Sequence, residues 1–153
     1  MRVGILTSGG DAPGINATIR GVGKTAINHY GMQVIGIQNG FSGLLYKDTI
    51  ELTDASLSGI LNLGGTILGT AREKIFRSMI SSPDEKDREQ IKDAYHELEL
   101  DCLVCIGGNG TQRTTWMLSE MGLNVVGVPK TIDNDVYGTD ITFGFDTAVN
   151  IAC

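Results

Sequence analysis

The residues best suited to chemistry lie in the segment 129–135, directly after an apolar run. This segment combines two carboxylates, Asp133 and Asp135, with the hydroxyl of Thr131 and the ammonium group of Lys130. A carboxylate beside a substrate hydroxyl can accept its proton, and carboxylates also bind Mg²⁺. A simple Asp-Asn-Asp turn is the alternative interpretation, so the segment by itself gives a hypothesis of acid–base or metal chemistry.

Two glycine-rich segments, 8–11 and 107–111, each lie between an apolar run and a predicted helix. Glycine lets the backbone approach a ligand closely, and the N–H groups at a helix start bind phosphate. Thr111 either caps its helix or bonds a phosphate oxygen, and a tight turn without ligand remains the alternative. A third glycine-rich stretch, 64–72, ends in Arg72, which is either a phosphate-binding or a surface cation.

Two further patterns carry no functional prediction. Residues 21–26 resemble the end of a P-loop and a dinucleotide fingerprint, but they lie inside a predicted helix rather than after a strand. Cys102 and Cys105 form a C-x-x-C pattern within an apolar run. Residues three apart on a strand point to opposite faces, so we expect ordinary free cysteines and no shared metal.

Composition excludes several classes of function. The chain of 153 residues has 41% hydrophobic residues and a net charge of −6. The negative charge argues against general binding to nucleic acid or to an anionic membrane surface. No apolar run approaches the length of a membrane span, and Met1 leads straight into a predicted strand. We therefore expect a cytoplasmic protein without a signal peptide.

Strands and helices alternate along the chain, which predicts the α/β class. Because the strands are apolar throughout, we expect a Rossmann-like, mostly parallel sheet with helices on both faces. The last predicted helix is still running at residue 153, so we expect a segment of a longer protein. The predicted strands are 2–7, 32–37, 101–106 and 124–128, and the predicted helices are 15–30, 56–63, one beginning at residue 82 or 83, 111–121 and 145–153.

Four separated motifs, taken together, resemble the phosphofructokinase family. The motifs are 8–17, 64–72, 107–111 and 129–135, the last followed by 138–140 and 144–148. Their order and spacing match the N-terminal, donor-phosphate-binding half of a subunit, over residues 1–153. The resemblance implies Mg²⁺-dependent phosphoryl transfer from ATP to the 1-hydroxyl of fructose 6-phosphate in glycolysis. It also implies a homodimer or homotetramer.

The resemblance also implies a role for individual residues. Asp133 matches the family's general base, Thr131 a residue that contacts the sugar and the transferring phosphoryl group, and Arg72 an arginine that stabilises phosphate charge. Asn109 and Asp135 match positions at the Mg²⁺ site. The implied donor-phosphate contacts are Gly10, Arg72, Glu73, Gly108, Asn109, Gly110, Thr111 and Lys130, and the implied sugar-phosphate contacts are Thr131, Ile132 and Asp133.

Three positions leave the activity open. The family usually has aspartate where this chain has Asn109, which favours a catalytically weak, ligand-binding paralogue as one alternative. Gly110 is typical of members that use ATP, whereas Lys130 is typical of members that use pyrophosphate. We expect ATP as donor and keep pyrophosphate as the alternative. A different small-molecule kinase with a similar glycine loop is a further alternative, against which the 129–140 motifs argue.

Effector control is expected to be weak or altered. Allosteric members of the family use basic residues from the first helix and from the region before residue 64. Arg20 and Lys24 could fill the first role, but residues 54–56 offer no arginine for the second. We therefore expect no sigmoidal response to ADP or phosphoenolpyruvate.

Overall fold

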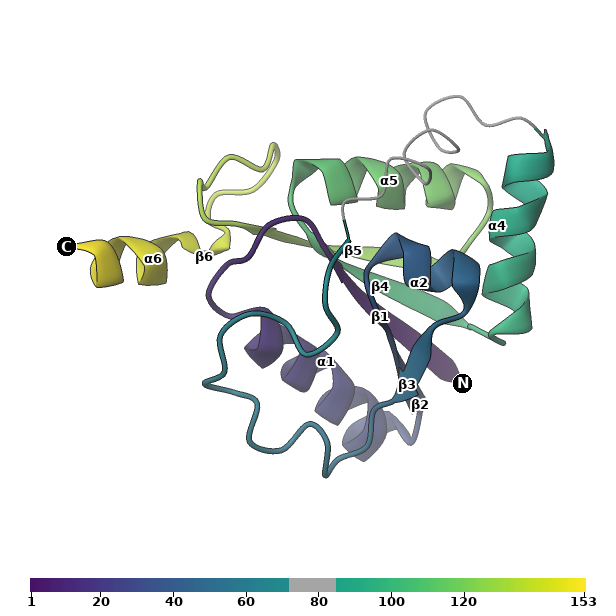
Figure 1. Cartoon of the computed structure of the whole chain (residues 1–153), viewed down its shortest axis with the longest axis horizontal. Helices are drawn as coiled ribbons and strands as arrows, with labels where there is room; N and C mark the ends of the chain where they lie inside the picture. Colours follow the sequence, from purple (N-terminus) through teal and green to yellow (C-terminus); the bar gives the residue numbers. More distant parts are fainter. Residues whose placement is uncertain (72–84) are drawn as a thin grey trace.

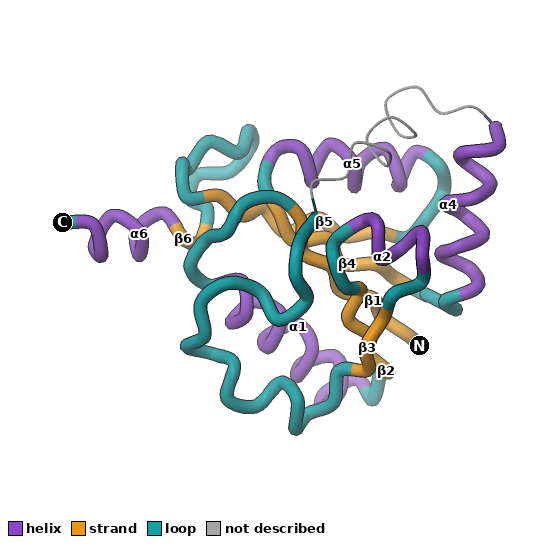
Figure 2. Tube along the Cα trace, viewed as in Figure 1, coloured by secondary structure: helices purple, strands orange, loops and turns teal. Residues whose placement is uncertain are grey.

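The computed structural model describes residues 1–71 and 85–153, in which strands and helices alternate (Figure 1). The Cα trace in Figure 2 follows the same path, with long loops joining the elements at one end of the sheet. The elements are β1 (Arg2–Ser8), α1 (Ile15–Tyr30), β2 (Gln33–Ile37), α2 (Phe41–Tyr46), β3 (Thr49–Glu51), α4 (Glu85–Glu97), β4 (Cys102–Gly107), α5 (Asn109–Glu120), β5 (Val125–Thr131), β6 (Phe143–Gly144) and α6 (Phe145–Ala152).

The described strands form one sheet in the order β3-β2-β1-β4-β5-β6. β1 pairs in parallel with β2 on one side and with β4 on the other, and β4 pairs in parallel with β5. β3 runs antiparallel to β2 at the edge. The chain thus adds β2 and β3 on one side of β1 and then β4, β5 and β6 on its other side. The boundary between β1 and β4 is a topological switch point, and α/β sheets bind ligands at such points.

Helices cover both faces of the sheet, as the sequence predicts (Figure 1). On one face, the apolar side chains of α2, α4 and α5 pack against the sheet, with Ile91 and Leu118 fully buried. On the other face lie α1 and the loop 52–68, with Ile15, Ile19 and Leu57 buried. The expected α/β class with a mostly parallel sheet is confirmed.

The predicted helix at residues 56–63 is wrong, because this segment forms successive turns instead. Thr53 and Ser56 bond each other reciprocally as at a helix start, and the N–H of Leu57 donates to the carbonyl of Thr53. Gly59 then adopts a φ of +85°, which ends the helical path after one turn. The start proposed for the next helix, at residue 82 or 83, lies outside the described residues.

Other element boundaries also differ from the sequence prediction. β5 continues through Lys130 and Thr131, so three residues of the segment 129–135 are strand rather than loop. α5 begins at Asn109 with Gly108 as its N-cap residue, two residues earlier than expected. The short elements α2, β3 and β6 were not predicted, because each has too few residues to show a periodic pattern.

The two cysteines of the C-x-x-C pattern lie on β4, as predicted. All three cysteines of the chain are free, with Cys105 buried, Cys102 half-buried and Cys153 exposed. Burial raises the pKa of the Cys105 thiol to about 12, so it stays protonated at neutral pH.

Residues 21–26, which resemble the end of a P-loop, lie within α1 as predicted. None of the described helices combines the length and apolarity needed to cross a lipid bilayer.

Candidate active site

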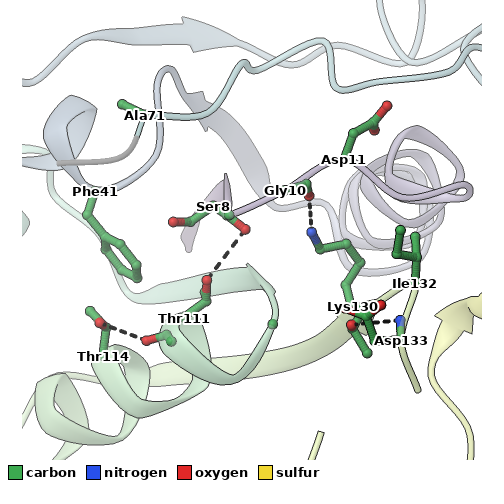
Figure 3. Close-up of a pocket in the computed structure, with 14 residues that line it drawn as sticks. Ser8, Gly10, Asp11, Phe41, Ala71, Thr111, Thr114, Lys130, Ile132 and Asp133 are labelled. Atoms are coloured by element: carbon green, nitrogen blue, oxygen red, sulfur yellow. Dashed lines mark hydrogen bonds between the residues drawn. The ribbon is translucent and has the colours of Figure 1, made fainter. Parts of the chain in front are cut away.

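A cavity of about 310 Å³ lies at the carboxyl ends of β1, β4 and β5 (Figure 3). Three segments that are far apart in the sequence form most of its wall, as predicted from the position of each segment after a strand. The lining residues are Ser8, Gly9, Gly10, Asp11, Phe41, Ala71, Gly108, Gly110, Thr111, Thr114, Lys130, Thr131, Ile132 and Asp133.

The first segment of the wall follows β1. Gly9 has a φ of +91°, a conformation that favours glycine, and this turn directs the backbone of Gly10 toward the cavity. The hydroxyl of Thr70 donates a 3.0 Å hydrogen bond to the carbonyl of Gly9 and so joins this turn to the loop that contains Ala71. At Gly9 and Gly10 the wall therefore consists of main-chain groups, flanked by Ser8 and Asp11.

The second segment connects β4 to α5. A Cβ atom on Gly107 would lie 2.3 Å from Thr111 Oγ1 and 2.6 Å from the carbonyl oxygen of Ser8, so only glycine fits there. No side chain caps α5 at Gly108. The main-chain N–H groups of its first turn therefore have no side-chain cap as partner, and a helix start of this kind favours an anion.

Thr111 is not the N-cap residue that the sequence left as one possibility. It is the third residue of α5, its side chain is 5% exposed, and its hydroxyl donates to the carbonyl of Ser8 at 3.4 Å. The hydroxyl therefore links the first two segments of the wall. Its position in the cavity wall remains compatible with the alternative role of bonding a phosphate oxygen.

The third segment is the end of β5, where Lys130 is buried with 3% of its surface exposed. Its ammonium group donates a hydrogen bond to the carbonyl of Gly10 and lines the cavity (Figure 3). Burial lowers the pKa of Lys130, while the nearby carboxylate of Asp11 opposes this shift. A buried cation at the edge of an open cavity is well suited to bind an anionic ligand.

The loop after β5 carries the carboxylates. The hydroxyl of Thr131 donates to Asp135 Oδ1 at 3.0 Å and accepts the N–H of Asp133 at 3.1 Å. These two bonds fold the loop into a compact turn in which Asp133 lines the cavity, together with Ile132. The carboxylate of Asp133 is thereby placed on the same side of the cavity as Lys130.

Asn109 and Asp135, the residues expected at a metal site, lie together but do not line the cavity. Asn109 Nδ2 donates to the main-chain carbonyl of Asp135 at 3.0 Å. Within residues 1–71 and 85–153, no group of three or more histidine, cysteine, aspartate or glutamate side chains could hold a metal ion alone. Two other expected phosphate contacts, Arg72 and Glu73, lie outside the described residues.

Sequence reasoning missed two side chains of the wall, Phe41 and Thr114, whereas Ser8 belongs to the predicted segment 8–11. Phe41 begins α2, which three residues separate from the end of β2, and its ring points toward α5 (Figure 3). The turn at Asn39 and Gly40, two residue types that commonly form turns, precedes Phe41 and lies at the carboxyl end of β2, which neighbours β1. That position is the signal that could have found Phe41.

Comparisons with known proteins, by sequence and by fold, point to one family. A family model described as Phosphofructokinase matches residues 2–153. The chain is 64% identical over 152 residues to ATP-dependent 6-phosphofructokinase 3 of Bacteroides thetaiotaomicron, which covers 99% of this chain and 45% of that relative. The chain thus spans about half the length of such curated relatives.

Two solved structures have the same fold. The phosphofructokinase of Saccharomyces cerevisiae matches with a TM-score of 0.81 and 31% identity, covering 99% of this chain and 23% of that chain. The pyrophosphate-dependent phosphofructokinase of Marinobacter aquaeolei matches with a TM-score of 0.75 and 25% identity, covering 95% and 37%. The chain is therefore much more similar in sequence to the relative whose name specifies ATP than to the pyrophosphate-dependent enzyme.

Proposed function

The chain belongs to the phosphofructokinase family, and from this premise we propose that it forms the donor-phosphate half of an ATP-dependent 6-phosphofructokinase. Residues 1–153 would then be the N-terminal domain of a longer subunit. The reaction transfers the terminal phosphoryl group of ATP to the 1-hydroxyl of fructose 6-phosphate and yields fructose 1,6-bisphosphate and ADP. The match to the family model over residues 2–153 argues against the alternative of an unrelated kinase with a similar loop.

One observation carries the proposal. A single cavity collects the glycine turn after β1, the N-terminus of α5 and the Lys130–Asp133 segment at the end of β5. The first two supply main-chain groups and a helix start for phosphate, and the third supplies a cation and a carboxylate. Phosphoryl transfer depends mainly on such positioning and on neutralising phosphate charge.

Asp133 is the proposed general base. Its carboxylate accepts the proton of the 1-hydroxyl as that oxygen bonds to phosphorus, while the bond from phosphorus to the ADP oxygen breaks. The N–H of Asp133 donates to Thr131 Oγ1, which fixes the turn that carries the carboxylate. Thr131 and Ile132 are the proposed neighbouring contacts to the sugar phosphate.

The donor side is proposed to consist of Gly10, the 108–111 segment and Lys130, with Arg72 and Glu73 assigned by resemblance alone. Gly110 lines the cavity without a side chain and leaves room for a nucleotide. This absence of bulk, with 64% identity to a relative whose name specifies ATP, supports ATP over pyrophosphate. Lys130 is the feature that favours pyrophosphate as the second candidate.

The residues at the proposed metal site fit Mg²⁺ carried by the donor phosphates. Mg²⁺ is held by one or two protein oxygens together with phosphates and waters, so a complete protein cage is unnecessary. Asn109 uses its amide nitrogen to bond the carbonyl of Asp135, which leaves its amide oxygen as a ligand, and Thr131 bonds Oδ1 of Asp135, which leaves Oδ2 of that carboxylate. When bound, Mg²⁺ neutralises charge on the transferred phosphoryl group.

The cellular setting is proposed from the same family membership. A glycolytic phosphofructokinase works in the cytoplasm on fructose 6-phosphate and ATP, and we propose a homodimer or homotetramer. Binding of nucleic acid or membrane is not part of the proposal, in agreement with the net charge of −6.

The direct test is formation of fructose 1,6-bisphosphate by the full-length protein with Mg²⁺ and either ATP or pyrophosphate. The proposal expects turnover with ATP. Turnover with pyrophosphate alone would assign donor choice to Lys130 and would replace ATP in the proposal. No turnover with either donor would favour the alternative of a ligand-binding paralogue, whose motivating feature is Asn109 in place of the usual aspartate.

A further inference from the structure

Asn109 makes a hydrogen bond that joins two sides of the proposed active site. Its Nδ2 donates to the main-chain carbonyl of Asp135 at 3.0 Å, and the two residues are 26 positions apart in the sequence. A carbonyl oxygen can only accept, so the partner atom on Asn109 must be the amide nitrogen. The bond therefore connects the first residue of α5 to the loop after β5.

Few other contacts restrain that loop from the donor side. Within the described residues, the side-chain hydrogen bonds of 131–135 run inside the turn or to Thr142 beyond it. Thr142 donates to Asn134 Oδ1 and so holds the loop on its β6 side. The bond from Asn109 is the one described hydrogen bond that ties the loop to the start of α5.

An aspartate at position 109 could not make this bond. An ionised carboxylate has no proton to donate, and it would place a negative charge against the carbonyl of Asp135. We propose that Asn109 is a positioning residue: its amide nitrogen holds the base-carrying loop against the donor-phosphate segment. This inference rests on the proposed function, and it expects no gain in activity when the family's usual aspartate is restored at position 109.

The spacing of the two segments decides the geometry of transfer. Gly108 and Gly110 lie on the donor side of the cavity, and Asp133 lies on the acceptor side. If the loop moves away from α5, the carboxylate of Asp133 moves away from the line of attack. A displacement of about 1 Å can lower a rate by as much as about 100-fold. Because Asn109 is exposed, its bond should matter more for this spacing than for global stability.

The test compares Asn109→Asp and Asn109→Ala in the full-length protein. Both variants remove the donor, but only aspartate retains an oxygen ligand and adds charge. We expect kcat with ATP to fall about tenfold in both, while the KM for ATP changes by no more than about twofold. We also expect faster hydrogen–deuterium exchange in residues 131–136 of both variants, and no decrease in the Mg²⁺ concentration needed for half-maximal activity in the aspartate variant.

Ser119→Asp is the matched control, because it adds the same charge at an exposed position near the other end of α5. It should leave exchange in 131–136 and kcat unchanged. The inference is overturned if Asn109→Asp raises kcat or lowers the Mg²⁺ requirement while Asn109→Ala does the reverse, since Asn109 would then act through its oxygen on the metal ion and not through the hydrogen bond that its nitrogen donates. Unchanged exchange in both variants also overturns it. Failure of the proposed function would be seen separately, because the wild-type protein would then show no turnover. The exchange data would still test the hydrogen bond between Asn109 and Asp135 in that case.

Discussion

The ammonium group of Lys130 donates a hydrogen bond to the main-chain carbonyl of Gly10, although 120 positions separate them in the sequence. This contact joins the end of β5 to the turn after β1, across the intervening strand β4. A lysine with 3% of its surface exposed would be costly to bury without such a partner. Since an ammonium group has three N–H donors, it can hold this turn and still offer a proton to an anion in the cavity.

Replacement of Lys130 by methionine should weaken binding of the phosphoryl donor. Methionine keeps similar length but loses the charge, and a hydrogen bond to a charged group is worth about 1.5–3 kcal/mol. We expect the KM for the preferred donor to rise about 10- to 100-fold in steady-state assays of the full-length protein. Lys86→Met, at an exposed position of α4, should have no such effect.

The lowered pKa of Lys130 adds a pH dependence. As pH rises, this lysine loses its charge before a free lysine does, so the donor KM of the wild-type protein should begin to rise at a lower pH than 10.5. Lys130→Met should lack this rise. A donor KM in the wild-type protein that does not depend on pH in this range would contradict the assigned role.

Asp133→Asn should abolish most of the turnover. The amide keeps the size of the side chain but cannot accept the hydroxyl proton, and loss of a general base costs about 10²- to 10⁴-fold in rate. We expect this fall in kcat with little change in the KM for ATP, measured by coupled assay. Asp140→Asn, an exposed carboxylate outside the cavity, is the control. Equal losses in the two variants would argue against a specific role for Asp133.

Two glycine substitutions should have opposite effects on stability. In Gly107→Ala the new Cβ would meet Thr111 Oγ1 at 2.3 Å, so we expect a loss of about 1–3 kcal/mol in the free energy of unfolding. In Gly21→Ala no atom lies within 4 Å of the new Cβ, which is at an exposed position of α1, and helix propensity predicts a gain of about 0.5–1 kcal/mol. Urea unfolding of both variants checks the prediction, and a neutral Gly107→Ala would show that the close packing there can relax.

Titration of the Tyr95 hydroxyl should lower the free energy of unfolding at high pH. Burial raises the pKa of its hydroxyl from 10.0 to about 12, with smaller contributions from Cys102 and Asp101. Between these values the unfolded chain loses the proton while the folded chain keeps it, so the free energy of unfolding decreases as pH rises. The stabilisation is fully present below pH 10.0 and is lost by about pH 12.

Tyr95→Phe isolates this contribution. The variant loses the 3.1 Å hydrogen bond from the hydroxyl to the carbonyl of Asn124, which should cost about 1 kcal/mol at neutral pH. The difference in urea unfolding between wild type and variant should shrink as pH rises above 10.0. Cys105 also titrates in this region, but it is present in both proteins and cancels. A difference that stays constant with pH would disprove the assignment to Tyr95.

Effector control is predicted to be weak. Lys24, one of the two basic residues of α1 considered for effector binding, forms a 2.7 Å ion pair with Asp54 and also donates to Ser58. Its positive charge is therefore engaged within the chain, and this ion pair lowers the pKa of Asp54. Initial-rate measurements with ADP and with phosphoenolpyruvate should remain hyperbolic. Sigmoidal, effector-dependent kinetics would contradict the prediction.

Much of the site was predictable because its parts follow strands. The glycine turn at Gly9, the start of α5 near Gly108 and the carboxylate Asp133 were each recognised from local residue types. Parallel strands end at the same edge of a sheet, so loops of this kind must lie near one another. The contribution of Phe41 was missed because it depends on which strand is the neighbour of β1, which no local pattern specifies.

The failed helix at residues 56–63 illustrates a second limit. Its residue types suit a helix, and one turn does begin at Thr53. Gly59 then takes a left-handed conformation, and Leu57 and Ile60 are buried against the face covered by α1. Packing of these side chains, rather than local preference, selects the turns.

The sequence by itself determined the α/β class, the mostly parallel sheet and the loops that carry chemistry, because periodicity and turn residues are local properties. Only the tertiary structure decided which groups meet. It placed the Lys130 ammonium on the carbonyl of Gly10, and it turned the amide of Asn109 toward the carbonyl of Asp135. Both partners are main-chain carbonyl oxygens, which every residue possesses, so no residue type could have revealed either contact.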